Sequence, residues 1–337
     1  MTDILNALVL FANFVLVPAT AYGSQLALGA LGITLVYGVL RFSNFAHGDT
    51  MAFGTMATVL ATWWLQSMGV SFGPLPTALL ALPAGIVVTG ALLLLTDKYV
   101  YKFYRAQRSP PVIYVIVSVG VMFMMNGLVR FIIGPDDQRF ADGARFLIKA
   151  REFKEMTGLR EGLSIKLSQG LTLAVAVTVV IALFWFLQKT RTGKAMRAFS
   201  DNEDLALLSG VNPDRVVMVA WLLVAALATI AGTLYGLDKS FKPFTYFQLL
   251  LPMFAAAIVG GIGQPIGAIA GGFVVAFSEV MVTYAYKKFL TYLTPEAWAP
   301  DTLVQLLATE YKFAVSFIIL VVVLLIRPTG LFRGKTI

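Results

Sequence analysis

Residues 4–40 read ILNALVLFANFVLVPATAYGSQLALGALGITLVYGVL, and this stretch contains no Asp, Glu, Lys or Arg. A helix that crosses the hydrocarbon core of a bilayer needs about 20 apolar residues to span ~30 Å, so the run is long enough for nearly two crossings. Further uncharged runs follow at 50–96, 109–129, 167–188, 216–237 and 243–278. Repeated uncharged runs of this length predict a protein that crosses the membrane many times.

The composition favours helices over a membrane barrel. Hydrophobic residues make up 58% of the chain and charged residues 13%, about half of the charged fraction that is usual in soluble domains. Strands of a membrane barrel alternate apolar and polar residues over segments of about ten residues, whereas the apolar blocks here are continuous. We therefore predict an all-α, polytopic bundle of about nine or ten transmembrane helices, organised as a single domain over residues 1–337.

The expected spans follow from the lengths of the runs. They lie near 21–40, 49–68, 74–96, 112–133, 167–188, 216–237, 247–262, 265–285 and 313–326. Residues 4–19 either form a further span or extend the first into one long tilted helix, because Pro18 and Gly23 permit a break without requiring one.

Basic residues gather just beyond three of the apolar runs. They are Lys98, Lys102, Arg105 and Arg108, then Lys189, Arg191, Lys194 and Arg197, and finally Arg327, Arg333 and Lys335. Cytoplasmic loops next to transmembrane helices carry an excess of Lys and Arg, so we expect all three clusters and the C-terminus in the cytoplasm. Residues 134–166 and 295–312 then lie outside. The net charge of +8 reflects this topology and does not indicate a nucleic-acid partner.

Composition and motif checks exclude several kinds of site. The chain has no cysteine and a single histidine, His47, which excludes disulfides and histidine-rich metal cages and predicts no metal site. The N-terminus lacks the basic segment of a cleavable signal peptide. The sequence GLFRGKT at 330–336 is one residue short of a phosphate loop, and no helix can follow it. We expect no ATPase activity and no cofactor in this chain.

A polar island interrupts two apolar stretches at 32–57, which read GITLVYGVLRFSNFAHGDTMAFGTMA. One interpretation is a cytoplasmic hairpin whose polar groups are solvated. The other is a helix break at membrane depth that places Asn44, His47 and Asp49 near a solute path, because irregular polar backbone at that depth must line a cavity or lie buried in protein.

The second segment of interest, 189–215, is more ordered than a linker. Ser200 and Glu203 have the spacing of a capping box, and Gly210 is suited to end a helix. Leu205, Leu207 and Leu208 give this short helix an apolar side. The helix either packs under the bundle or docks into a groove of a cytoplasmic partner.

A glycine-rich segment, GGIGQPIGAIAGG at 260–272, follows the seventh expected span. It contains Gly260, Gly261, Gly263, Gly267 and Gly271. A dinucleotide-binding loop would need a preceding strand, and none is expected here. A tight intramembrane turn with close helix packing, aided by the GxxxG spacing of Gly267 and Gly271, fits better.

Two ionisable residues fall within expected spans. Arg130 lies near a span end, from which its side chain can reach the interface. Glu279 lies deeper, where a charge is costly unless it is paired or hydrated. Its role is either pairing with another helix or transport. His47 and Asp49 are two residues apart and would not face each other on a helix, which argues against an intramembrane enzyme.

Together these segments resemble the inner-membrane permease of the branched-chain amino acid ABC transporter family, the LivH-type subunit. The pattern GxxLVYGxxxxxNFAHGxxxxxG matches residues 32–54, and NFAHG is its most specific part. The pattern TxxGxAxRAxxxxxxxAxLxGxN matches 190–212, and GGxGxxxGAxxGG matches 260–272. The likeness extends over residues 20 to 332. The part before Tyr22 and the loop 134–166 are longer than in the family.

The resemblance implies a bacterial inner-membrane importer for branched-chain or related amino acids, surrounded by lipid. Its expected partners are a second related permease subunit, two cytoplasmic ATP-binding cassette subunits and a periplasmic solute-binding protein. The residues that would couple to the ATPases are Arg197, Ser200, Glu203, Leu205, Leu207, Leu208 and Gly210. Alternatives are a permease for urea or short amides, and a secondary transporter or channel that works alone, for which Glu279 would be the coupling carboxylate.

Overall fold

The computed structural model describes residues 2–140, 142, 145–294, 302 and 304–332. Its α-helices are α1 (Thr2–Phe11), α2 (Val17–Leu40), α3 (His47–Ser67), α4 (Ala78–Thr96), α5 (Lys102–Ala106), α6 (Pro111–Ile133), α7 (Ala150–Thr157), α8 (Leu167–Lys189), α9 (Arg191–Asp201), α10 (Glu203–Leu208), α11 (Pro213–Asp238), α12 (Pro243–Gly260), α13 (Pro265–Thr283), α14 (Lys287–Leu293) and α15 (Lys312–Ile326). Wider π-helical turns occur at Ala12–Leu16 and Asp97–Tyr101, and a 3₁₀ turn at Thr309–Tyr311. Strands β1 (Phe146–Ile148) and β2 (Ile165–Lys166) pair antiparallel.

Eight helices in the described residues are long and apolar enough to cross a membrane, which confirms a polytopic all-α fold. The expected number of nine or ten is too high by this measure, for two reasons. Residues 4–19 form no separate span, because they continue into α2. The expected span at 49–68 is a helix, α3, but it is less apolar than the eight.

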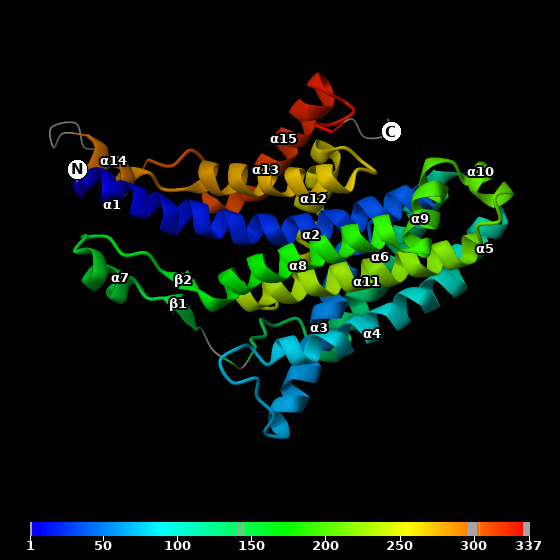
Figure 1. Ribbon diagram of the computed structural model, residues 1–337, viewed down its shortest axis with the longest axis horizontal. Coiled ribbons are helices and arrows are strands. Elements are labelled where there is room, and N and C mark those ends of the chain that lie inside the picture. The colour runs from blue at the N-terminus through cyan, green and yellow to red at the C-terminus, as the bar shows by residue number, and fades with distance from the viewer. Residues whose placement is uncertain (1, 141, 143–144, 295–301, 303, 333–337) are drawn as a thin grey trace.

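The helix from Thr2 to Leu40 is continuous and runs along most of the molecule (Figure 1). Pro18 has no N–H group to donate to the carbonyl four residues earlier. The π-helical turn at Ala12–Leu16 comes just before it and shifts the hydrogen-bonding register there, so the helix passes the proline without breaking. The local sequence therefore permitted a break at Pro18, but the helix is unbroken there in the packed bundle.

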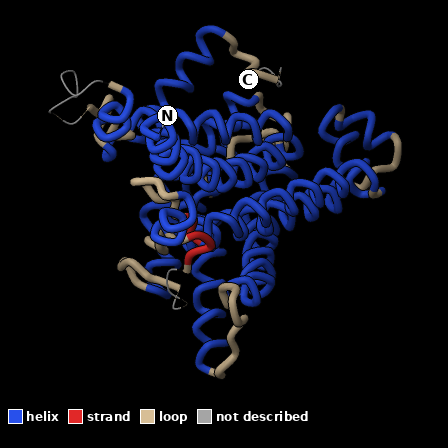
Figure 2. The backbone as a smooth tube through the Cα atoms, turned by 60° about the vertical axis from the view of Figure 1, so that its left-hand side comes forward, coloured by secondary structure: helices blue, strands red, loops and turns tan. Residues whose placement is uncertain are grey.

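The core of the bundle surrounds α2, whose residues from Tyr22 to Val36 are all buried. Helices α13, α11, α12 and α8 pack around it, and α3 packs against α11 (Figures 1 and 2). The threonines of α3 are turned inward: Thr50, Thr55, Thr58 and Thr62 are completely buried. Each hydroxyl donates to the carbonyl four residues earlier. This local pairing lets a less apolar helix lie in the core.

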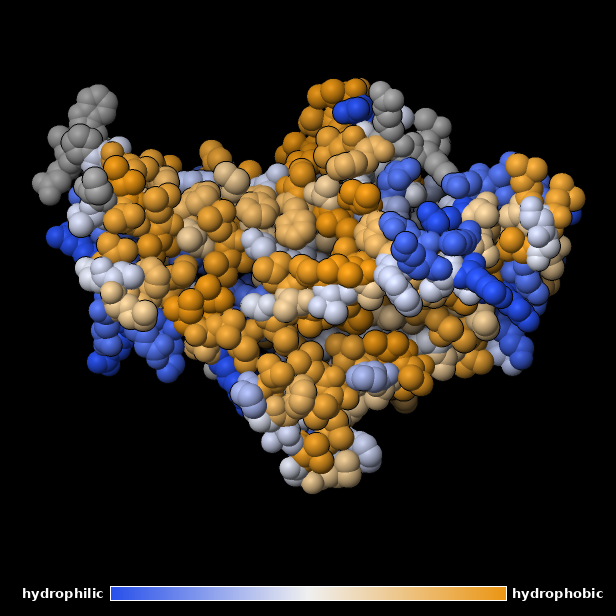
Figure 3. All heavy atoms as spheres, viewed as in Figure 1, coloured by the Kyte–Doolittle hydropathy of each residue, from blue (hydrophilic) through white to orange (hydrophobic). Residues whose placement is uncertain are grey.

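The molecule has an apolar middle and two polar ends (Figure 3). At one end lie the N-terminal helix α1, α14, α7 and the β1–β2 pair, and at the other lie α5, α9 and α10 (Figure 1). The basic residues of α5 and α9 thus share one end, which we call the basic end. The expected outer loop, 134–166, belongs to the opposite end. There the backbones of Gln138 and Phe241 exchange two hydrogen bonds of 2.8 Å.

Candidate functional site

Residues 42–49, the re-entrant segment, turn back into the bundle after α2. The helix ends at Arg41, which has a left-handed backbone conformation (φ 59°). Downstream, the ring of His47 lies against Gly32, where an added Cβ would sit 2.5 Å from the imidazole Cε1. Gly32 lies two turns before the end of α2, so the chain must double back along that helix to reach it. The helix break therefore lies inside the bundle.

Asn44 organises the turn that starts α3. Its Oδ1 accepts a hydrogen bond of 3.0 Å from the N–H of Ala46 and one of 3.5 Å from the hydroxyl of Tyr101. The neighbouring N–H of Phe45 donates to Ser118 Oγ of α6 at 3.1 Å. Side chains from two other parts of the fold thus hold an irregular backbone in place, as buried backbone requires.

His47 and Asp49 are completely buried but incompletely paired. Asp49 Oδ1 accepts a 2.7 Å hydrogen bond from Asn126 of α6, whereas Oδ2 has no partner in the described residues. The imidazole of His47 faces the α2 backbone at Gly29 and Gly32 without a well-formed hydrogen bond. Unpaired buried polar atoms are costly, which marks this as a place for water or a solute.

The solvated-hairpin interpretation of this segment is therefore wrong. Asn44 is 2% exposed, and His47 and Asp49 are not exposed at all. Glycines at 32 and 48 let the segment approach α2 and α12 closely enough to exclude solvent: a Cβ on Gly48 would lie 2.7 Å from the carbonyl oxygen of Tyr246. The structure instead has a polar helix break that is buried within the bundle, as the other interpretation predicted.

Glu279 lies elsewhere in the bundle. It is buried on α13 and accepts a hydrogen bond from Ser316 of α15, whereas its Oε2 has no partner in the described residues. One turn before Ser316, the ammonium of Lys312 lies 5.4 Å from the ring centroid of Tyr22. Tyr22 and Gly32 are separated by about 15 Å along α2 at 1.5 Å per residue. The structure thus pairs Glu279 with a neighbouring helix and does not bring it to the re-entrant segment.

The segment 189–215 forms two helices with a sharp break between them. Asn202 begins α10, because its Oδ1 accepts from the N–H of Leu205 at 3.0 Å. The capping box expected from Ser200 and Glu203 is wrong: Ser200 lies in the last turn of α9, and Asn202 supplies the acceptor in its place. Gly210 does end the helix, in a left-handed conformation (φ 80°).

The apolar side of α10 faces away from the bundle. The side chains of Leu205, Leu207 and Leu208 are 61%, 42% and 85% exposed. The helix projects at the basic end, beyond the spanning helices (Figure 1). A packing role under the bundle would bury these leucines, so the structure leaves them available to a partner.

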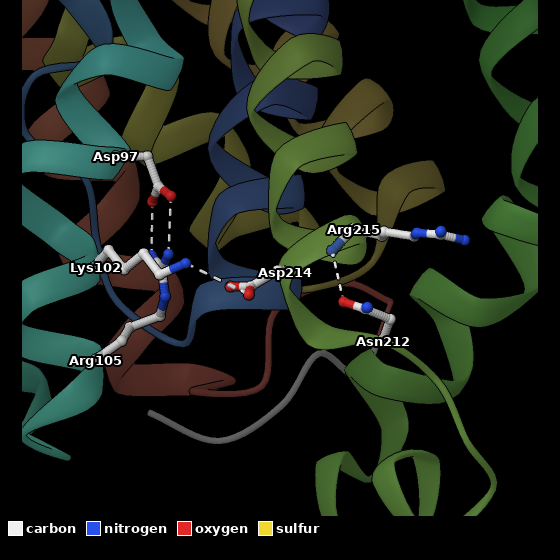
Figure 4. A network of polar contacts seen from close by, with 6 residues as sticks. All are labelled: Asp97, Lys102, Arg105, Asn212, Asp214 and Arg215. Carbon is white, nitrogen blue, oxygen red and sulfur yellow. Dashed lines mark hydrogen bonds and ion pairs between the residues drawn. The ribbon is translucent and has the colours of Figure 1, made fainter.

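One ion pair joins the far end of segment 189–215 to α5 (Figure 4). Lys102 lies 3.4 Å from Asp214, and Asn212 caps α11 through the N–H of Arg215. Beside them, Arg105 forms a bidentate pair with Asp97. The Asp97 carboxylate also accepts a 2.7 Å hydrogen bond from the buried indole of Trp221 on α11. Sequence analysis missed this pairing, because nothing local links positions 97 and 221.

The glycine-rich segment is a tight turn with close helix contact, as expected. Gly261 and Gly263 have φ angles of 112° and 82°. A Cβ on Gly260 would lie 1.9 Å from the carbonyl oxygen of Gly267, and one on Gly271 would lie 2.0 Å from that of Ala256. Only glycine allows α12 and α13 to approach this closely. The N–H groups of residues 331 and 332 also donate to carbonyls at the end of α12, a contact that no motif indicated.

The molecule is a bundle of apolar helices, and its interior contains a buried polar helix break. These two features define its class: it is a multi-pass membrane transport protein. The family model described as "Branched-chain amino acid transport system / permease component" matches residues 15–324. The chain therefore belongs to this family of permease components. Such proteins are transport subunits and not enzymes, and they work with ATPase and solute-binding partners.

Named relatives cover nearly the whole chain. The permease LivH of a high-affinity branched-chain amino acid transport system in Escherichia coli K12 is 30% identical over 92% of this chain and 91% of its own length. BraD of Pseudomonas aeruginosa, described in the same terms, is 29% identical over 94% of each chain. Among solved structures, PsaBC from Streptococcus pneumoniae with Fab aligns at a TM-score of 0.46 and 12% identity, over 93% of this chain and 91% of that one.

Proposed function

We propose that this chain is the permease subunit of an ABC importer that moves branched-chain or related amino acids across the bacterial inner membrane. The observation that carries the proposal is the family match over residues 15–324, together with 30% identity to LivH over 92% of the chain. Two separate ATP-binding cassette subunits supply the energy, a periplasmic binding protein delivers the solute, and a related second permease completes the pore.

The re-entrant segment forms part of the solute path in this proposal. Its support is the pair of buried, incompletely paired side chains, His47 and Asp49. A helix that starts inside the bundle also directs its N-terminal N–H groups inward, where they favour a carboxylate. Glu279 is a further candidate for the path: Ser316 donates to one of its oxygens, but Oε2 is buried without a partner in the described residues.

The α9–α10 segment receives the motion of the ATPases. The support for this role is the exposed leucine face of α10 at the basic end. Positive residues at that end favour a cytoplasmic location, and the same rule applied to Arg327, Arg333 and Lys335 supports a cytoplasmic C-terminus. The shared core around α2 supports a single permease domain over residues 1–337.

Co-purification tests the proposal. The tagged chain is expressed with the genes that adjoin its own, purified in mild detergent, and assayed for ATP hydrolysis with a leucine-loaded binding protein. We expect a complex that contains ATPase subunits, with hydrolysis stimulated by the loaded binding protein. A chain that purifies alone, and that moves leucine into liposomes without ATP, would overturn the importer.

A further inference from the structure

A cavity of about 270 Å³ lies at the basic end, between the end of α2, the end of α8, α9 and the start of α13. We call it the amphipathic cavity. It is separate from the re-entrant segment, which does not line it. Drug-sized ligands occupy pockets of about 300–1,000 Å³, so this cavity suits a smaller molecule.

Opposite charges line the cavity from one helix. Arg197 and Asp201 stand four residues apart on α9, and both border the cavity. Neither side chain forms an ion pair with the other or with another described residue. A cation and an anion side by side, both unpaired, are suited to a ligand that carries one charge of each sign.

A helix terminus adds hydrogen-bonding capacity. On the α13 side of the cavity, the helix begins after Gln264, whose side chain does not cap it. The first N–H groups of a helix have no partner within the helix and carry a partial positive charge. The N–H of Ile266, at this terminus, is such a group.

Most of the remaining lining is apolar, although Gln188 and Ser200 also border the cavity. It includes Leu35, Val39, Phe184, Leu187 and Met196. A wall of branched aliphatic and thioether groups gains free energy by burying a hydrocarbon side chain. A small zwitterion with an apolar side chain therefore matches the charged pair and the apolar wall.

We propose that the amphipathic cavity binds a free α-amino acid with an apolar side chain, the class of solute assigned to the importer, on which this inference rests. Arg197 and the α13 terminus hold the carboxylate, Asp201 holds the ammonium group, and the side chain lies against the apolar wall. The carboxylate of Asp201 disfavours the phosphate of a lipid headgroup at the same place.

A ligand bound in the amphipathic cavity connects α9 to α2 and α13, because it contacts all three helices. When ATP hydrolysis moves α9, these ligand contacts must break, so the motion is less favourable while the ligand is bound. Amino acid accumulated in the cytoplasm thus slows its own uptake, and the cavity acts as a site of product inhibition close to the ATPase-docking helix.

Photolabelling tests the location of the site. The complete transporter, with its binding protein, is irradiated with a diazirine analogue of leucine, and labelled peptides are identified by mass spectrometry. We expect label in residues 34–39, 184–188 or 263–266 that excess leucine competes away. Asp201→Asn should weaken this labelling by about tenfold, the scale of one charge-assisted hydrogen bond, whereas Asp204→Asn on α10, outside the cavity, should not.

Transport assays test the consequence. Proteoliposomes that contain the complex and luminal ATP are loaded with or without L-leucine, and the initial rate of ATP hydrolysis is compared within each variant. Luminal leucine should lower the rate for the parent protein and for Asp204→Asn, and have little effect on Asp201→Asn.

Three results would overturn the site while leaving the importer intact: ATP-driven uptake without competable label in the cavity, equal inhibition of both variants, or a phospholipid retained there that leucine does not displace. Loss of ATP-driven uptake in the parent protein would instead count against the importer itself.

Discussion

The guanidinium of Arg41 donates a hydrogen bond to the main-chain carbonyl of Ser200. This contact joins the last residue before the re-entrant segment to the last turn of α9. A cation at the C-terminal end of a helix also interacts favourably with the helix dipole. Arg41 holds a left-handed conformation (φ 59°), which is uncommon for a residue with a side chain. A physical link therefore connects the coupling segment to the buried polar break.

Removal of this link should uncouple ATP hydrolysis from uptake. Arg41→Gly keeps the left-handed backbone free of strain and deletes the guanidinium. We expect uptake per ATP to fall about tenfold, because a charge-assisted hydrogen bond contributes about 1.5–3 kcal/mol. Co-purification with the ATPases should be unchanged. Arg215→Ala, at an exposed position of the same end, is the control. Equal coupling ratios in the two variants would refute the role of Arg41.

Charges on the leucine face of α10 should prevent assembly. The double variant Leu207→Asp and Leu208→Asp places carboxylates in the proposed apolar contact, and we expect loss of the ATPases from the purified complex. Membrane insertion should be normal, because these side chains are already exposed. Met156→Asp, at 86% exposure on α7 of the opposite end, controls for a general effect of an added charge. Normal ATPase recovery from the double variant would show that α10 is not the docking helix.

Substitutions in the re-entrant segment should lower uptake more than assembly. His47→Ala and Asn44→Ala remove polar groups from the proposed path, and we expect uptake to fall by at least about tenfold for one of them, on the scale of one lost polar contact. Thr62→Val is the matched control, since Thr62 is equally buried on α3 and its hydroxyl bonds only its own helix. Labelled-leucine uptake is measured per assembled complex. Uptake at the parental level in both variants would remove the segment from the path.

Gly32→Ala should destabilise the bundle. The new methyl group would lie 2.5 Å from the His47 ring, and overpacking of this kind costs about 1–3 kcal/mol. Gly120→Ala on α6 is the control, because no atom lies within 4 Å of its added Cβ, so it should be neutral or stabilising through helix propensity. Thermal unfolding in detergent compares the two. A Gly32→Ala protein as stable as Gly120→Ala would contradict the close contact of α2 and His47.

The outer end should loosen in acid. Burial raises the pKa of Glu161, but hydrogen bonds from Lys288 and Tyr292 outweigh it, and its pKa lies below the ordinary value. A lowered carboxyl pKa in the folded state means that Glu161 stabilises the fold at neutral pH. This contribution begins to decline near the unfolded value of about 4.3 and is lost as the pH falls through the folded pKa. The N–H of Glu161 also donates to Asn6 of α1.

The measurement is protease resistance of the outer end between pH 7 and pH 3. The parent protein should lose protease resistance as the pH falls below the pKa of an unfolded-state glutamate. The Glu161→Gln variant should be less resistant to protease at neutral pH, and its resistance should change less with pH. Identical profiles for the two proteins would show that the ion pair with Lys288 adds no stability.

Hydrophobic patterning was sufficient to predict the class of fold. A charge in the hydrocarbon layer is so unfavourable that uncharged runs mark the helices and basic clusters mark their ends. The glycine-rich turn was also predictable, because the absence of a Cβ is itself the cause of the close approach at Gly260 and Gly267. The apolar side of α10 was also predictable from three leucines in a short polar segment, but whether that side packs under the bundle or is exposed was not.

Only the tertiary structure decided where the polar groups lie. Local sequence could not distinguish a solvated hairpin from a buried break at Asn44–Asp49, because the difference is whether other helices cover the segment. The same holds for the unbroken helix through Pro18 and for the pairing of Glu279 with Ser316. Arg41 and Ser200 stand 159 positions apart, and a contact over that separation exists only once the helices have packed.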